Sequence, residues 1–249
     1  MKISIVTVAR NAEDFIESCI ASILNQSYHD IEYIIIDGAS TDHTVDIIQK
    51  YRQNIHHFIS EKDNGIYDAM NKGIELASGE VIGILNADDF FPDAEIVSKI
   101  AAKFLSGNAD VVYGDLLYTD RADTDKITRK WKSKNYSQGL FQWGWMPAHP
   151  TFYARRTLFE KFGNYKLNYG SAADYELMIR FIHKHHAKTA YLPEVIVKMR
   201  SGGVSNQSLK NRLKASKADL SAMKANGIVF PLLAAFLKPV RKIPQFLGL

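Results

Sequence analysis

The sequence has little cysteine and no long apolar run. Its 249 residues include one cysteine, Cys19, which excludes an internal disulfide and a cysteine-rich metal site and favours a reducing compartment. The longest apolar run, residues 228–237, is about half as long as a membrane span and contains Pro231. We therefore predict a cytoplasmic protein with no membrane-spanning helix, and we interpret the first residues as a strand rather than a signal peptide.

Two common phosphate-binding motifs are also missing. No GxGxxG follows the first predicted strand, and GxxxxGK[ST] occurs nowhere, which disfavours ordinary dinucleotide binding and P-loop chemistry. A nucleotidyltransferase is disfavoured for the same reason, since such enzymes usually begin with a glycine-rich phosphate loop. Apolar residues at 46% and charged residues at 23% are typical of a folded soluble chain and exclude a mainly disordered or fibrous one.

Charge is unevenly distributed along the chain. After Asn206 there are eight basic residues and one acid, Asp219, a net charge of +7, whereas the remainder carries −3. In this C-terminal segment the basic residues alternate with apolar blocks that contain Phe230, Phe236 and Phe246. This pattern suits a segment lying at a membrane surface, and it equally suits a helix pair packed on the domain's own core. Nucleic acid is the weaker partner, because the lysine-rich helix lacks interleaved aromatics.

Apolar strands and amphipathic helices alternate through the first half of the chain. This order predicts an α/β domain over residues 1–206, with a mostly parallel central sheet covered by helices on both faces, followed by a basic helical tail over residues 207–249. Later segments predict helices at 155–162 and 174–184 and two further strands at 188–192 and 195–199. The five early strands are predicted at 3–8, 32–36, 55–60, 80–85 and 109–113.

Ligands of parallel sheets bind beyond the carboxyl ends of the strands, so the polar residues there are candidates for a site. Asp88 and Asp89 are costly to hold together, which points to a divalent cation with phosphate as its other partner, or else to a helix cap. The remaining candidates after the first three strands are Thr7, Arg10, Asn11, Asp37, Asp63 and Asp68.

Three features of the second half can carry chemistry, and each has a structural alternative. Asp174, where a helix begins, is a general base or an N-cap. His149, held between two prolines, contacts a phosphate or acceptor, or is a satisfied buried histidine. Trp143 and Trp145 stack on an acceptor sugar or fill the core.

Four motifs occur in order along the first half of the chain: residues 5–11 (IVTVARN), 36–42 (IDGASTD), 64–73 (NGIYDAMNKG) and 86–89 (NADD). In this order and spacing they resemble the motifs of family 2 glycosyltransferases with the GT-A fold, and the resemblance spans roughly residues 1–205. Two later segments, His149-Pro150-Thr151-Phe152 and Ala173-Asp174-Tyr175-Glu176-Leu177, are similar to those of the branch that builds bacterial surface polysaccharides, such as O-antigen or capsule.

The resemblance implies a role for individual residues. Thr7 and Asp37 match nucleotide-contacting positions, with Asp37 placed to accept the uracil N3–H, so a UDP-sugar is the expected donor. Asp88 matches the second acid of the DxD motif and, with Asp89 as the next ligand, holds Mn²⁺ or Mg²⁺. Asp174 matches the catalytic base, and Arg200 matches a stretch that closes over the diphosphate.

The chain departs from the family pattern at three positions. Asn86 replaces the first acid of DxD, Ala173 replaces an acid that often precedes the base, and Arg10 stands where an aromatic is common. The expected function is inverting sugar transfer to a saccharide acceptor linked to a polyprenyl diphosphate, at the cytoplasmic face of the inner membrane. A non-catalytic nucleotide-sugar-binding scaffold and a nucleotidyltransferase remain alternatives.

Overall fold

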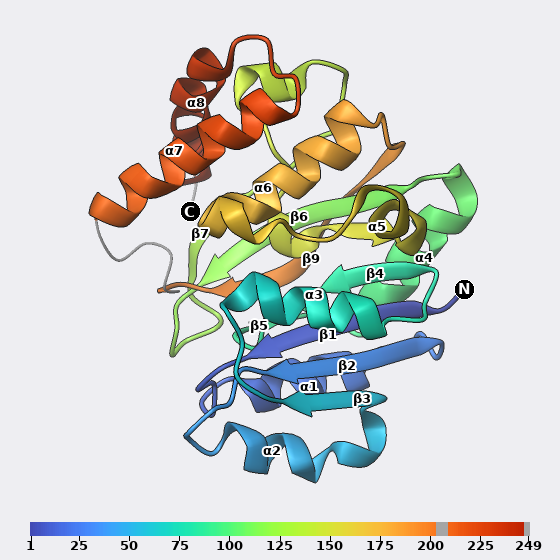
Figure 1. The fold of residues 1–249 in the computed structure, drawn as a ribbon. Helices are drawn as coiled ribbons and strands as arrows, with labels where there is room; N and C mark the ends of the chain where they lie inside the picture. Colours follow the sequence, from blue (N-terminus) through green and yellow to red (C-terminus); the bar gives the residue numbers. More distant parts are fainter. Residues whose placement is uncertain (203–208, 247–249) are drawn as a thin grey trace.

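The structure, a computed structural model, describes the backbone of residues 1–202 and 209–246 (Figure 1). Within these residues one sheet of nine strands runs in the order β3-β2-β1-β4-β8-β6-β9-β5, with β7 on the outer side of β6. The strands are β1 (Ile3–Ala9), β2 (Ile31–Asp37), β3 (His57–Ser60), β4 (Val81–Ile84), β5 (Asp89–Phe90), β6 (Val111–Thr119), β7 (Ile127–Trp131), β8 (Tyr153–Arg155) and β9 (Thr189–Arg200). The helices are α1 (Ile16–Leu24), α2 (Thr44–Lys50), α3 (Ile66–Leu76), α4 (Ile96–Gly107), α5 (Arg156–Phe162), α6 (Ala173–Met178), α7 (Leu209–Ala225) and α8 (Pro231–Val240).

The first four strands form the parallel part of the sheet. β1 lies between β2 and β4, and β3 pairs outside β2. Successive side chains of a strand point to opposite faces. Val6 contacts α3, where a methyl group on Gly73 would meet Val6 Cγ1 at 2.2 Å, and the next residue, Thr7, lies 3.7 Å from Cys19 of α1. Helices therefore cover both faces, as predicted.

The second half of the sheet is mixed rather than parallel. β8 runs antiparallel to both β4 and β6, and β5 runs antiparallel to β9, whereas β6 and β9 are parallel. The predicted parallel pairing is therefore found among β1–β4 and between β6 and β9, while the short strands β5, β7 and β8 add antiparallel pairs. Strands β8 and β5 have three and two residues. Such short segments carry no alternating pattern that a sequence can display.

β9 also differs from the prediction. One strand of 12 residues replaces the two expected at 188–192 and 195–199, and it continues through Pro193 with shifts of register against β6. Its far end pairs Met199 with Asp89 of β5 and Arg200 with Thr119 of β6. The long strand thereby brings the predicted residue Arg200 beside the acid pair.

The C-terminal helices pack on the domain. Ala222 and Met223 of α7 and Ala234 of α8 are completely buried. A methyl group on Gly144 would lie 2.5 Å from the Lys238 amide nitrogen, so α8 rests directly on the loop after the 3-10 helix η2 (Leu140–Trp143). The C-terminal helices therefore pack on the domain's own core, which was one of the two alternatives for the tail. The predicted domain boundary at residue 206 lies outside the described residues.

One side of α8 and the segment after it still faces solvent. Leu232 is 71% exposed and Phe236 is 68% exposed, and neighbouring apolar side chains are similarly open. We call this surface the α8 apolar face; it comprises Val229, Phe230, Leu232, Leu233, Phe236, Val240, Ile243 and Phe246. Over the part of the chain that the structure describes, no helix has the length and apolar character needed to cross a bilayer.

Candidate active site

Asp37 ends β2 with its side chain fully buried. Its carboxylate accepts hydrogen bonds from the Ser40 amide at 3.0 Å and the Ser60 hydroxyl at 2.7 Å, and from the Ser40 hydroxyl. These contacts hold the turn that follows β2 against the end of β3. They leave the carboxylate in a fixed orientation at the carboxyl edge of the sheet.

The loops after β1, β2 and β3 meet at this edge. Asn11, in a left-handed conformation with φ +48°, accepts a hydrogen bond from the Thr41 amide at 2.9 Å. A methyl group on Gly38 would lie 2.2 Å from Asp63 Oδ2 and 3.5 Å from Arg10 Cδ. Arg10, Asn11 and Asp63, predicted as donor-binding residues, therefore gather around the turn that follows Asp37.

Two other predicted donor-binding residues have structural partners. The Thr7 side chain is buried beside Cys19 of α1, and its hydroxyl accepts a hydrogen bond from the Tyr33 hydroxyl of β2 at 3.3 Å. Any ligand contact by Thr7 is thus left to its backbone. Asp68 accepts a hydrogen bond from the Asn64 amide at 2.9 Å and lies 3.9 Å from Lys72, so it organises the first turn of α3.

The acid pair follows β4. Asp89 is fully buried, while Asp88 is partly exposed. Burial raises the pKa of both carboxyl groups, and the Asp88 charge raises that of Asp89 further. Arg200 opposes this shift: its guanidinium donates to the Asp88 carbonyl at 2.9 Å and to the Ser18 hydroxyl at 3.0 Å. Arg121 also lowers the pKa of Asp88.

The residues at this place fit a hard divalent cation. Among the described residues, the buried oxygens Asn86 Oδ1 and Asp89 Oδ1 have no hydrogen-bond partner. The Asn86 amide donates to Asp89 Oδ2 at 3.3 Å. Carboxylate and amide oxygens are the ligands that Mn²⁺ and Mg²⁺ take, and a bound cation favours the ionised carboxylates that burial disfavours. Three or more His, Cys, Asp or Glu side chains do not converge anywhere in the described part of the chain.

Asp174 lies in the first turn of α6, and 17% of its side chain is exposed. Oδ1 accepts a hydrogen bond from the Tyr175 amide at 2.7 Å, and Oδ2 lies 3.5 Å from His149 Nδ1. Burial and the Asp174 carboxylate together raise the pKa of Tyr67, which comes from α3. The N-cap alternative is not what the structure has, because Asp174 lies within the first turn and Ala172 occupies the cap.

Tyr118 connects the acid pair with Asp174. Burial raises the pKa of its phenol, and the carboxylates of both Asp89 and Asp174 raise it further, while Arg129 lowers it. The charges of both carboxylates therefore act on this one phenol. The pairing of β6 with β7 and β9 places Tyr118 opposite Arg129 and Met199. Met199 also pairs with Asp89 of β5, so Tyr118 and Asp89 lie on either side of the same β9 residue.

The two tryptophans predicted to contact the acceptor, Trp143 and Trp145, differ in how far their side chains are buried. Trp143 is 53% exposed at the end of η2, whereas Trp145 is 7% exposed. Trp145 packs against the rings of Tyr113, Tyr136 and Phe141 at centroid distances of 5.4–5.9 Å. Of the two alternatives for Trp145, core packing is the one that this position supports.

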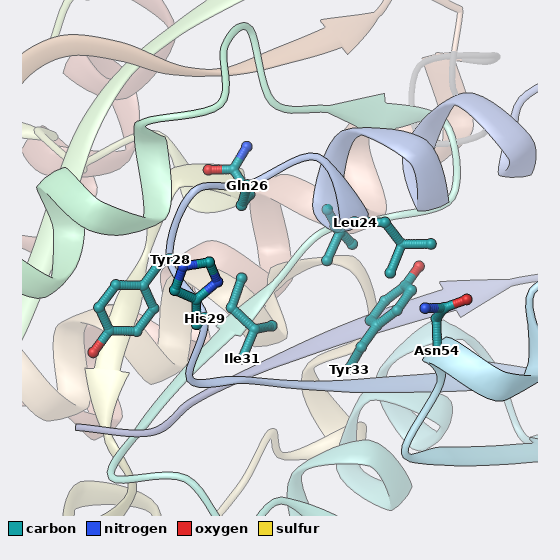
Figure 2. A pocket seen from close by; sticks show the side chains of 8 residues that line it. Leu24, Gln26, Tyr28, His29, Ile31, Tyr33 and Asn54 are labelled. Carbon is teal, nitrogen blue, oxygen red and sulfur yellow. The ribbon is translucent and has the colours of Figure 1, made fainter.

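A hollow of about 190 Å³ lies at the opposite end of the sheet (Figure 2). Its walls include Tyr28, His29, Ile31 and Tyr33, which lead into or begin β2, whereas Asp37 ends that strand. The hollow therefore does not belong to the acid pair or to Asp174. A second hollow, of about 330 Å³, lies between α3 and α5 and includes Arg156 and Glu160.

Sequence reasoning missed several residues of this region. Tyr118, Arg121 and Arg129 come from the stretch after residue 115, where strand and loop signals are weak. The guanidinium of Arg121 lies 4.2 Å from the centroid of the Phe15 ring, and that of Arg200 lies 5.2 Å from the same centroid. The available signal was the pair of arginines in a polar stretch of mixed charge, in a chain with a predicted anionic site.

The family model described as Glycosyl transferase family 2 matches residues 4–166. The chain belongs to this family.

Curated relatives agree. The PGL/p-HBAD biosynthesis glycosyltransferase of Mycobacterium bovis (strain BCG / Pasteur 1173P2) is 31% identical over 216 residues, covering 82% of this chain and 78% of that protein. The putative teichuronic acid biosynthesis glycosyltransferase TuaG of Bacillus subtilis (strain 168) is 32% identical over 142 residues, covering 55% of this chain and 56% of that protein.

Solved structures agree on the fold. S. aureus TarS 1-349 in complex with UDP has a TM-score of 0.70 at 18% identity, covering 95% of this chain and 71% of that one. The mannosyltransferase PcManGT from Pyrobaculum calidifontis, in complex with GDP-Man and Mn²⁺, has a TM-score of 0.68 at 16% identity, covering 95% and 69%. The predicted GT-A fold is confirmed.

Proposed function

We propose that this glycosyltransferase moves a sugar from a UDP-sugar to a saccharide acceptor with inversion at the anomeric carbon. The observation that carries the proposal is the position of Tyr118, which pairs with the same β9 residue, Met199, as Asp89 does, and whose phenol is also affected by the Asp174 charge. Donor and base then serve a single reaction space. Solved neighbours that contain UDP, or GDP-Man with Mn²⁺, support a nucleotide-sugar donor and a divalent cation.

In this proposal the nucleotide binds at the edge formed by β1, β2 and β3. Asp37 accepts the uracil N3–H, and Arg10, Asn11 and Asp63 line the neighbouring loops. Asp88 and Asp89 hold Mn²⁺ or Mg²⁺, which when bound neutralises charge on the diphosphate. Arg200, fixed by the Asp88 carbonyl and Ser18, adds a second positive charge at the same place.

Asp174 performs the proton transfer. Its Oδ2 takes the proton from the acceptor hydroxyl, whose oxygen forms a bond to the anomeric carbon from the face opposite the leaving group. The bond from that carbon to the diphosphate oxygen breaks, and the nucleoside diphosphate leaves with the electron pair. The Tyr175 amide holds Oδ1, so Oδ2 is the oxygen left to the acceptor side. His149, at 3.5 Å from Oδ2, positions the carboxylate.

The acceptor in this proposal is linked to a membrane polyprenyl diphosphate, and the enzyme works at the cytoplasmic surface of the inner membrane. The α8 apolar face supports this, because large exposed apolar side chains next to Lys238, Arg241 and Lys242 are typical of interfacial segments. The relative named for teichuronic acid biosynthesis supports a cell-surface polysaccharide as the product.

A panel of UDP- and GDP-sugars tests the donor. We expect one UDP-sugar to be hydrolysed slowly without acceptor, only with Mn²⁺ or Mg²⁺, and to raise the melting temperature. Stabilisation without turnover on any acceptor extract would favour the scaffold alternative. Release of inorganic diphosphate from a nucleoside triphosphate and a sugar phosphate would favour the nucleotidyltransferase.

Flotation with anionic liposomes tests the membrane contact. The double variant Leu232→Glu/Phe236→Glu should lose at least tenfold in bound fraction, because two charges replace exposed apolar contacts. Leu105→Glu, at a position on α4 that is 70% exposed, is the matched control and should bind like wild type. Unchanged binding of the double variant would contradict the interfacial role of α8. These substitutions leave the buried contacts of Ala222 and Met223 intact, which truncation at Asn206 would not.

A further inference from the structure

A group of cations from two distant parts of the chain lies over Trp131 and over Tyr175, the residue that follows Asp174. Arg129 on β7 lies over the rings of Tyr118 and Trp131 at 4.5 and 5.3 Å from their centroids. Lys242, after α8, lies over the same Trp131 ring at 5.8 Å. The Arg129 guanidinium donates to Gln245 Oε1 at 2.8 Å, which ties β7 to the 3-10 helix η7 (Ile243–Phe246). The tail therefore completes this part of the site.

The cations are poorly compensated by the protein. Lys238, the third member, pairs with Asp219 at 2.7 Å and lies 3.5 Å from the Tyr175 ring centroid. Among the described residues no ion pair joins Arg129 or Lys242 to a carboxylate. Burial and the charges of Lys238 and Arg129 lower the pKa of Lys242 to about 8. Holding like charges together in a partly desolvated place is costly unless an anion binds there.

The position of these cations also limits which anion they serve. The charges of Lys242, Lys238 and Arg129 all act on His149, which adjoins Asp174. The donor diphosphate has its own partners in the proposed function, the acid pair with its cation and Arg200. The α8 apolar face lies on the same segment as Lys238 and Lys242. An anion held here is thus near the base, and an attached chain has an apolar surface to follow.

We propose that Arg129 and Lys242 form the binding site for the phosphate groups of the lipid-linked acceptor, so that the C-terminal segment orients the acceptor toward Asp174. The inference rests on the proposed function. Arg129 and Lys242 are positioning residues, since they hold the acceptor without touching the atoms that react. Guanidinium and ammonium groups are the usual protein partners of phosphate oxygens.

Calorimetric titration of the full chain with farnesyl diphosphate, a soluble prenyl diphosphate, measures binding at the proposed phosphate site. Titration of the same samples with UDP in the presence of Mn²⁺ measures binding at the donor site. Lys242→Gln and Arg129→Gln should each weaken farnesyl diphosphate binding roughly tenfold and leave the UDP affinity unchanged. Lys242→Arg should retain most of the affinity. The control Lys224→Gln removes one tail charge at an exposed position of α7 and should change neither ligand.

Each other outcome has a separate meaning. Equal weakening of UDP and farnesyl diphosphate would assign the cations to the donor and overturn the proposal, as would wild-type affinity for farnesyl diphosphate in both glutamine variants or no binding by wild type. Absence of UDP and GDP binding to the wild-type protein at any Mn²⁺ or Mg²⁺ concentration would instead refute the proposed function. Melting temperatures within a few degrees of wild type exclude loss of the fold as the cause.

Discussion

The two halves of the candidate site are built differently. On the donor side, Asp37 and Asn11 are held by hydroxyl and amide groups of adjacent loops, all at the ends of parallel strands. On the acceptor side, Asp174, Arg129 and Lys242 come from α6, β7 and the segment after α8, and aromatic rings surround them. The proposed donor half is formed by loops at the ends of strands of the sheet. The proposed acceptor half includes residues of the C-terminal tail, so it forms only when the tail packs on the domain.

This contrast matches the chemistry that each half is proposed to perform. A nucleotide diphosphate presents the same groups to every enzyme that uses it, and fixed strand ends suit a constant ligand. Acceptors differ among such enzymes, and loops or appended helices vary more readily than a sheet. Substitutions on the two sides should therefore separate donor binding from acceptor binding.

The largest expected effect is on turnover. Asp174→Asn should lower kcat roughly a thousandfold, because the amide cannot take the acceptor proton, while its oxygen can still accept the Tyr175 amide hydrogen. UDP affinity in the presence of Mn²⁺ should stay within twofold of wild type. Steady-state kinetics and calorimetry measure both quantities. A variant with near wild-type kcat would remove Asp174 from the role of base.

A smaller loss is expected from the acid pair. Asp88→Asn should weaken Mn²⁺-dependent UDP binding and activity roughly a hundredfold, since one carboxylate ligand is lost and Asp89 remains. Asp30→Asn, at the opposite edge of the sheet beside Met1, is the matched control. Titration of activity with Mn²⁺ provides the measurement. If Asp88→Asn and Asp30→Asn have the same metal dependence, the cation does not bind at Asp88.

A substitution at Gly144, where the loop after η2 contacts α8, should weaken the packing of the tail on the domain. Gly144→Ala should destabilise the protein by about 2 kcal/mol, because φ is +72° and the added methyl group would lie 2.5 Å from the α8 backbone. Farnesyl diphosphate binding should fall and UDP binding should persist. Gly139 also has a positive φ but has open space around it, so Gly139→Ala measures the destabilisation that comes from the backbone conformation alone. Identical losses in the two variants would mean that α8 does not depend on this contact.

The smallest expected effect is a dependence on pH. Lys242 faces Lys238, Arg129, Asp219 and Asp174, and its pKa is lowered to about 8. As pH rises through this value the ammonium loses its proton, so farnesyl diphosphate affinity should fall several-fold between about pH 7 and 9. The dependence should disappear in Lys242→Arg, because arginine stays protonated. A fall of the same size in that variant would place the titrating group elsewhere.

The fold was predictable where apolar pattern and element length agree. The isoleucine-rich runs of β1 and β2 and the helices between them leave one topology, and the polar residues at their ends locate the donor side. The two-residue strand β5 carries no pattern, and Arg129 lies on β7, a short polar strand that pairs with β6. Trp145 and Trp143 are indistinguishable by sequence, because burial of one ring depends on which side of η2 faces the core.

The tail was predictable in composition and only partly in placement. Its apolar and basic residues suit both a membrane surface and a protein core, and in the structure some of the apolar ones are buried while others are exposed. Ala222, Met223 and Ala234 are buried, while Leu232 and Phe236 face outward. Lys242 gains its position from Trp131 and Arg129, more than 100 residues earlier in the chain, and no local pattern encodes such a contact.

A crystal structure with UDP and Mn²⁺, measured at a wavelength where manganese scatters anomalously, tests most directly whether the two halves face one reaction space. We predict a manganese peak on Asp88 or Asp89 with the diphosphate bound to it, and a terminal phosphate directed toward the side that holds Asp174. A peak at any other acidic group, or a diphosphate separated from Asp174 by the body of the sheet, would contradict the account.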